Sequence, residues 1–149
     1  MQRWPTDETA HPYMRANEEK RGAEVMKVVV SGSRRIKQLP EEAEQALRKI
    51  MQLQYEVLVG DCHGVDLAVQ RFLHAHCYAK VTVFHVGLRP RHNVGFPSVS
   101  VHGSQQGAKD RRMCQEADCG LAIWDGQSPG TKWNIERVPR TRVITVGKV

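Results

Sequence analysis

The stretch Leu121-Ala-Ile-Trp-Asp-Gly-Gln-Ser-Pro-Gly-Thr-Lys-Trp-Asn-Ile135 is the part of the sequence from which the fold is best inferred. It begins as a short apolar run, breaks at Asp125-Gly126, and becomes helix-like after Gly130-Thr131. This order predicts a strand, a tight loop and the start of a helix. Glycine lets the backbone approach a ligand, and Ser128 and Thr131 place hydroxyl groups beside the free N–H groups of the new helix. The turn is typical of an anion site, or of an ordinary connection in which Thr131 is only the N-cap.

The same pattern occurs twice in the first half of the chain. Residues 27–31 form a β-branched run without alternation, which is typical of a strand buried on both faces of a parallel sheet. The turn 32–35 and a helix with apolar residues at helical spacing between 39 and 53 follow it. A second strand at 56–59 leads through the glycine-bearing loop 60–66 directly into a second helix.

The second half continues this alternation after a long interruption. Residues 80–86 predict a third strand, and the following segment to about residue 107 is rich in Gly, Ser, Pro and His without periodicity. We predict a loop there, either functional or mobile. A short helix at 109–117 precedes the fourth strand at about residue 121. A helix from about Thr131 to Val138 and a fifth strand at 142–146 complete the pattern.

Strands that alternate with helices predict an α/β fold with a doubly wound parallel sheet of about five strands in three α/β/α layers. In such sheets, ligands bind at the carboxyl edge, where the strand order reverses. Four loops with unusual residues follow the carboxyl ends of strands: 32–35, 60–66, 89–93 and 125–131. We therefore expect these loops to converge on one site.

Composition predicts a single soluble domain. The 149 residues are 40% hydrophobic and 26% charged, and no apolar run approaches the roughly 18 residues of a membrane span. Residues 1–25 lack periodicity and are expected to form a flexible tail before a domain at 26–149. The first residues lack the apolar core of a signal peptide, which predicts a cytoplasmic protein. A net charge of +6 favours anionic partners such as nucleotides or nucleic acid.

The spacing of the cysteines and the lack of common nucleotide-binding motifs disfavour several kinds of site. Four cysteines at irregular spacing, without a Cys-x-x-Cys pair, indicate neither a disulfide scaffold nor a common zinc site, so no metal is expected. The sequence has no Gly-x-Gly-x-x-Gly after the first strand and no Gly-Lys-Ser/Thr loop. Hydride transfer and ATP hydrolysis are therefore disfavoured.

Several polar residues in the loops have two possible roles. Arg34 and Arg35 would pair with phosphate or be solvated cations at a strand end. Asp66 would act in the site or match the dipole of its helix. Asp125 would bind a ribose hydroxyl or hold its own turn.

Five motifs in this order resemble the SLOG superfamily. They are Val-Ser-Gly-Ser-Arg ending at Arg34, Val-Gly-Asp-Cys-His-Gly-Val-Asp-Leu-Ala from Val59, Lys-Asp-Arg-Arg-Met from Lys109, Ala117-Asp118, and Ile-Trp-Asp-Gly-Gln-Ser-Pro-Gly-Thr ending at Thr131. This superfamily comprises Rossmann-like domains related to the lysine-decarboxylase-like phosphoribohydrolases and the DNA-processing protein. The likeness covers roughly residues 27–146.

The resemblance implies a pocket for a nucleotide or an ADP-ribose-like ligand, with the loops 60–66 and 126–131 gripping phosphate. It also implies that relatives self-associate, so a homo-oligomer is expected. Together with the loop pattern, it gives these expected ligand-binding residues: Gly32, Ser33, Arg34, Gly60, Asp61, Gly64, Asp66, Lys109, Asp110, Asp125, Gly126, Ser128, Gly130, Thr131 and Asn134.

The resemblance also bears on catalysis. The phosphoribohydrolase branch carries an Arg and a Glu at the positions that here are matched by Lys109 and Asn134. Asn cannot serve as the acid or base that glycosidic cleavage needs. We therefore assign no catalytic residue and expect a binding protein, a sensor or carrier, rather than an enzyme.

Two other functions stay open. The first is an N-glycosidase that acts on nucleoside 5′-monophosphates. The second, ranked last, is binding of single-stranded nucleic acid, which Arg89-Pro90-Arg91-His92 and the basic cluster 137–142 favour, although aromatic residues for base stacking are few.

Overall fold

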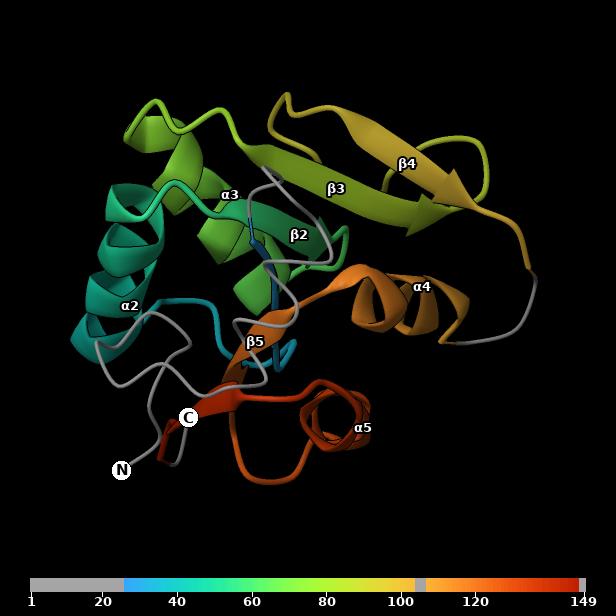
Figure 1. Cartoon of the computed structure of the whole chain (residues 1–149). Helices are drawn as coiled ribbons and strands as arrows, with labels where there is room; N and C mark the ends of the chain where they lie inside the picture. Colours follow the sequence, from blue (N-terminus) through green and yellow to red (C-terminus); the bar gives the residue numbers. More distant parts are fainter. Residues whose placement is uncertain (1–25, 104–106, 148–149) are drawn as a thin grey trace.

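The computed structural model describes residues 26–103 and 107–147, and a parallel sheet with the strand order β4-β3-β2-β1-β5-β6 lies at its centre (Figure 1). Each strand pairs in parallel with its neighbours. The strands are β1 (Lys27–Gly32), β2 (Glu56–Gly60), β3 (Val81–Val86), β4 (Ser98–Val101), β5 (Cys119–Trp124) and β6 (Thr141–Thr145).

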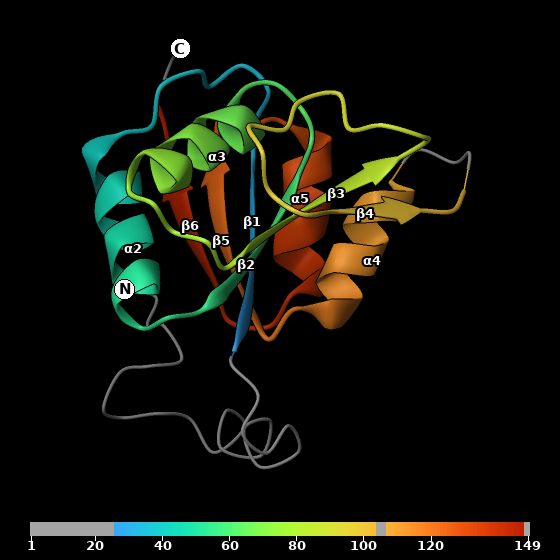
Figure 2. The same cartoon turned by 90° about the horizontal axis from the view of Figure 1, so that it is seen from above.

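Two helices cover each face of this sheet, which gives three layers (Figure 2). The helices α2 (Glu41–Gln52) and α3 (Val65–Ala75) pack on one face, and α4 (Ala108–Glu116) and α5 (Pro129–Arg137) pack on the other. The prediction of a Rossmann-like, doubly wound α/β fold is confirmed.

The apolar runs of the central strands are explained by burial on both faces. Val28 and Val30 point to the α2 and α3 side, where they join a cluster with Leu47. Val29, between them, points to the other side and packs with Met113 of α4. Because successive side chains of a strand alternate between faces, a strand covered on both sides needs apolar residues at every position.

The sheet has one strand more than the predicted number of about five, because β4 lies inside the segment predicted as a loop. Ser98 pairs with Val83, and Val101 pairs with Val86. This edge strand has only four residues with alternating Ser and Val, a signal too short to separate from the surrounding loop residues.

The start of the last helix also differs from the prediction. α5 begins at Pro129 instead of about Thr131, so Thr131 is an interior residue of the first turn rather than the N-cap. Proline is favoured at the first helical position because its missing N–H would have no partner there and its φ suits the helix.

The predicted tail at residues 1–25 lies outside the described residues. None of the helices that the structure describes has both the length and the apolar character needed to span a membrane.

The order of the strands defines one switch point. From β1 the chain adds β2, β3 and β4 in one direction, and it then returns to place β5 on the opposite side of β1. Gly32 at the end of β1 pairs with Ile123 near the end of β5. The loops that leave these two strands diverge to opposite sides of the sheet, so a crevice is expected between them.

Candidate functional site

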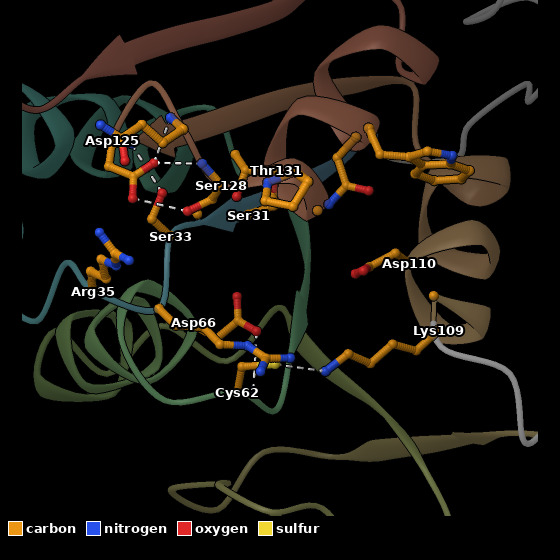
Figure 3. Close-up of a pocket in the computed structure, with 18 of the residues that line it drawn as sticks. Ser31, Ser33, Arg35, Cys62, Asp66, Lys109, Asp110, Asp125, Ser128 and Thr131 are labelled. Carbon is orange, nitrogen blue, oxygen red and sulfur yellow. Dashed lines mark hydrogen bonds between the residues drawn. The ribbon is translucent and has the colours of Figure 1, made fainter.

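A cavity of about 1210 Å³ lies at this switch point. The end of β1, the loop after β5 and the first turns of α3, α4 and α5 contribute to its walls (Figure 3). Of the residues expected to bind ligand, those that line it are Gly32, Ser33, Arg34, Asp66, Lys109, Asp110, Asp125, Ser128, Gly130, Thr131 and Asn134.

The other four expected residues, Gly60, Asp61, Gly64 and Gly126, are not part of the cavity wall. Their positions give them supporting roles in the loops, as the contacts of Asp61 and Gly64 show below. Conversely, sequence reasoning did not assign Cys62, Arg91, Arg111 and Trp133 to the site, although all four line the cavity.

Ser33 holds three of the loops together. Its Oγ accepts a hydrogen bond from the Asp125 N–H at 3.0 Å, and its N–H donates to the Ile123 carbonyl at 3.1 Å. Its own carbonyl accepts the Val65 N–H at 3.3 Å. Ser33 is almost completely buried, so these bonds are shielded from water and fix the loops after β1, β2 and β5 relative to one another.

Gly64 brings the loops after β1 and β2 into backbone contact. Its φ is 78°, a left-handed conformation that favours glycine. A Cβ atom at this position would overlap the backbone of Arg34. The close approach sets the position from which Arg34 faces the cavity.

Asp125 holds its own turn, which is one of the two roles predicted for it. Its carboxylate accepts the N–H groups of Gln127 and Ser128 at 2.9 and 2.8 Å, and the Ser128 hydroxyl at 3.0 Å. The hydrogen bond from the Ser128 backbone, with that from Gln127, lowers the pKa of Asp125 to about 2. Figure 3 shows this turn beside Ser33, directly before the N-terminus of α5.

Asp61 is the buried centre of an ionic cluster that includes the nearly buried Lys109 and the exposed Arg91. Lys109 Nζ lies 2.6 Å from its Oδ1, and the Arg91 guanidinium lies 3.1 Å from the same atom. Both cations also approach Cys62 Sγ, at 3.1 and 3.2 Å. Burial raises the pKa of Asp61, but the hydrogen bonds from Arg91 and Lys109 outweigh it and hold the pKa well below its usual range.

Gln70 attaches the β3–β4 loop to this cluster. Its buried side-chain amide donates to the Gly60 carbonyl at 3.0 Å and to the His92 carbonyl at 3.2 Å, and it accepts the Val94 N–H at 3.1 Å. With Arg91 bound to Asp61, the loop 89–93 meets the loop 60–66. Arg91 lies in the loop 89–93 that was expected at the site, but its partner Asp61 and the partners of Gln70 are distant in sequence, so the sequence did not predict these contacts.

Asp66 and Asp110 enter the cavity from different sides (Figure 3). Burial raises the pKa of Asp66 to about 7, against the opposing influence of Lys109 and of the Cys62 N–H, which donates to Oδ2 at 3.1 Å. Burial also raises the pKa of Asp110, although Lys109 and a hydrogen bond from Asn134 oppose this shift. The Asp66 carboxyl group can therefore carry a proton near neutral pH.

The remaining lining favours an anion. Five cationic side chains line the cavity, Arg34, Arg35, Arg91, Lys109 and Arg111, against the three carboxyl groups of Asp66, Asp110 and Asp125. At the start of α5, Pro129 has no N–H, so Gly130 and Thr131 supply the first amide donors at the positive end of the helix. Helix N-termini of this kind bind phosphate.

Three of the cations that suggested nucleic-acid binding have partners in the structure. Arg91 is held by Asp61, Arg142 lies 3.4 Å from Glu42, and the Arg137 guanidinium stacks on the Trp133 ring. Within the described ranges, no group of three or more His, Cys, Asp or Glu side chains could hold a metal ion.

In comparisons with known proteins, no protein-family model and no curated protein matches the chain.

Proposed function

We propose that this chain binds a nucleotide or a nucleotide-derived phosphate ligand in the switch-point cavity and acts as a sensor or carrier. The observation that carries this proposal is the juxtaposition, in one cavity, of Arg34 and Arg35 with the N-terminal turn of α5. Cationic side chains and free helix amides together bind phosphate through charge-assisted hydrogen bonds.

The size of the cavity supports a ligand larger than a phosphate ion. Its volume of about 1210 Å³ slightly exceeds the range of about 300–1000 Å³ that is usual for small-molecule sites. The motif order that resembles the SLOG superfamily supports the same ligand class. We include membership of that superfamily, and its tendency to form homo-oligomers, in the proposal; light scattering after size-exclusion chromatography would test the oligomer.

A thermal-shift screen with AMP, ADP, ATP, NAD and ADP-ribose tests the proposal. A ligand at 100 times its Kd stabilises the folded state by about 2.7 kcal/mol, so at least one compound should raise Tm by several degrees. No shift with any of them at millimolar concentration would refute the proposal.

A matched pair of variants then locates the site. Arg34→Gln removes a cation from the cavity wall and should raise the Kd of the ligand, measured by calorimetry, about tenfold or more. Arg71→Gln makes the same change at an exposed position on α3, outside the cavity, and should leave Kd within about twofold. Equal losses in both variants would place the ligand elsewhere.

Cleavage of an N-glycosidic bond is the alternative that a specific observation favours. Asn134 cannot supply an acid or a base, but it lies in hydrogen-bonding contact with Asp110, and Asp110 and Asp66 both face the cavity. Enzymes that cleave glycosidic bonds usually use two carboxyl groups as catalytic residues. Chromatographic detection of adenine released from AMP by the wild type, and not by Asp110→Asn, would establish this activity, whereas release at the buffer rate would exclude it.

A further inference from the structure

The two ends of the switch-point cavity differ in chemistry. Figure 3 shows Arg35 on one side of the cavity, the side of the turn that leads into α5, and Asp110 of α4 on the other. α5 contacts α4 and contributes Trp133, its fifth residue, to the cavity wall. Trp133 is three residues beyond Gly130, which corresponds to about 4.5 Å along the helix axis.

Trp133 offers a flat apolar surface at this second end. It lines the cavity and is only half-buried, although tryptophan is among the most apolar side chains by area. The guanidinium of Arg137 lies 4.4 Å from the ring centroid and occupies one face of the indole. The opposite face of the ring is the natural place for a second planar group.

Asp110 makes the same end unsuited to phosphate. Its carboxyl group points into the cavity and is more buried than the neighbouring Arg111, which is exposed to solvent (Figure 3). Lys109, the other cation of this turn, already pairs with Asp61 at 2.6 Å. A carboxylate repels phosphate but accepts hydrogen bonds from the N–H groups of a heterocycle.

We propose that the end of the cavity between α4 and α5 is a nucleobase subsite, in which the base of a nucleoside 5′-phosphate stacks on Trp133 with its polar edge toward Asp110. This inference rests on the proposed function, because the phosphate of the same ligand occupies the end with Arg34 and the α5 amides. It specifies the ligand as one that carries both a base and a phosphate. It also assigns base recognition to Trp133, which no motif in the sequence marks.

Calorimetry with AMP, GMP, CMP, UMP and ribose 5-phosphate tests the subsite. At least one nucleotide should bind ten or more times more tightly than ribose 5-phosphate, which shares the sugar and phosphate but lacks the base. Trp133→Leu should raise the Kd of that nucleotide about 5- to 150-fold, as expected for the loss of one base–aromatic stack. It should leave the Kd of ribose 5-phosphate within about twofold. Trp133→Phe keeps an aromatic face and should retain most of the affinity.

The possible failures differ. If none of the five compounds binds but ADP, ATP, NAD or ADP-ribose does, the nucleobase subsite for a nucleoside 5′-monophosphate is refuted and the proposed function stands; if no compound of either set binds, the proposed function itself fails. If ribose 5-phosphate binds as tightly as every nucleotide, or if Trp133→Leu weakens both ligands equally, phosphate binding stands and the nucleobase subsite is refuted. Unchanged Tm values of the free variants would show that the affinity changes do not reflect unfolding.

Discussion

At the scale of single residues, the site depends on one buried carboxylate that pairs with two cations. Asp61 is 1% exposed and is the common partner of Lys109 and Arg91. It does not line the cavity, yet it determines where two of the cavity's cations lie. A carboxylate with this role contributes to ligand binding through position rather than contact.

Replacing Asp61 should therefore destabilise the fold. Asp61→Asn leaves the buried Lys109 ammonium without its charged partner, and breaking a buried pair in this way costs about 3 kcal/mol. Urea unfolding would measure the loss. Glu136→Gln is the matched control, because it removes a carboxylate from the exposed pair with Arg137 and should cost under about 1 kcal/mol. Similar losses in the two variants would contradict the structural role of Asp61.

Asp66 should make stability depend on pH in the direction opposite to most carboxylates. Burial raises its pKa from 3.8 to about 7, so the folded state binds a proton that the unfolded state has released. The free energy of unfolding contributed by Asp66 is thus complete below about pH 4 and is lost as the pH rises through 7.

Asp66→Asn removes this titration and keeps an oxygen that can accept the Cys62 N–H. Relative to the wild type, the variant should gain about 2 to 3 kcal/mol between pH 5 and pH 8. Urea denaturation at several pH values would measure the difference, and parallel profiles for the two proteins would show that Asp66 titrates normally.

At the scale of elements, the position of the loops depends on close backbone contact. Gly64 and Gly126 both have positive φ, 78° and 81°. A Cβ atom at Gly64 would overlap Arg34, whereas one at Gly126 would meet no atom within 4 Å. Alanine substitutions at Gly64 and Gly126 therefore distinguish the free-energy cost of the left-handed backbone conformation, which both share, from the cost of the overlap with Arg34, which only Gly64 has.

Gly64→Ala should lower the free energy of unfolding by at least about 2 kcal/mol more than Gly126→Ala, since only the first variant adds overpacking to the conformational cost. Gly64→Ala should also lower the affinity for phosphate ligands, because the loop that carries Arg34 must move. Urea unfolding and calorimetry would measure both effects. Equal destabilisation by the two substitutions would mean that the loops after β1 and β2 are not in contact.

The elements that the sequence predicted correctly are those with long, local patterns. The β-branched runs of β1 and β2 and the helical spacing of α2 each specify their conformation without reference to the rest of the chain. β4 was missed because its four residues become a strand only by pairing with β3. The start of α5 was placed too late because Gly130 was taken as loop, although Pro129 is a normal first residue of a helix.

In the site too, features with a local sequence pattern could be predicted, and contacts between distant residues could not. The glycine loops could be located because they follow predicted strands, and the sheet topology then brings them to one edge. Arg91 could not be assigned, because its role comes from Asp61, thirty positions earlier in the chain. Trp133 could not be assigned either, because a half-buried indole on a short helix has the same sequence signature whether it packs on the surface or faces a ligand.

At the scale of the whole molecule, the cavity lies where the two parts of the sheet meet. β1 to β4 form one part and β5 with β6 forms the other, and among the described strands the two parts are paired through β1 and β5. Ser33 adds a link between the loops of the two parts. A ligand that contacts Arg34 on one side and Gly130 on the other would connect the same two parts, so binding and global stability should be coupled.

The sheet itself should not be equally stable throughout. β1 is paired on both sides and has a buried interior, whereas β4 pairs only with β3 and exposes Ser98 and Ser100. The slowest amides of residues 27–32 should therefore exchange with solvent only on global unfolding, and those of residues 98–101 through local opening at much lower free energy. Hydrogen exchange followed by mass spectrometry across a range of urea concentrations distinguishes the two routes, because only global unfolding accelerates strongly with denaturant. Equal protection and equal urea dependence in the two strands would mean that β4 is an integral part of the central sheet rather than a separately opening edge.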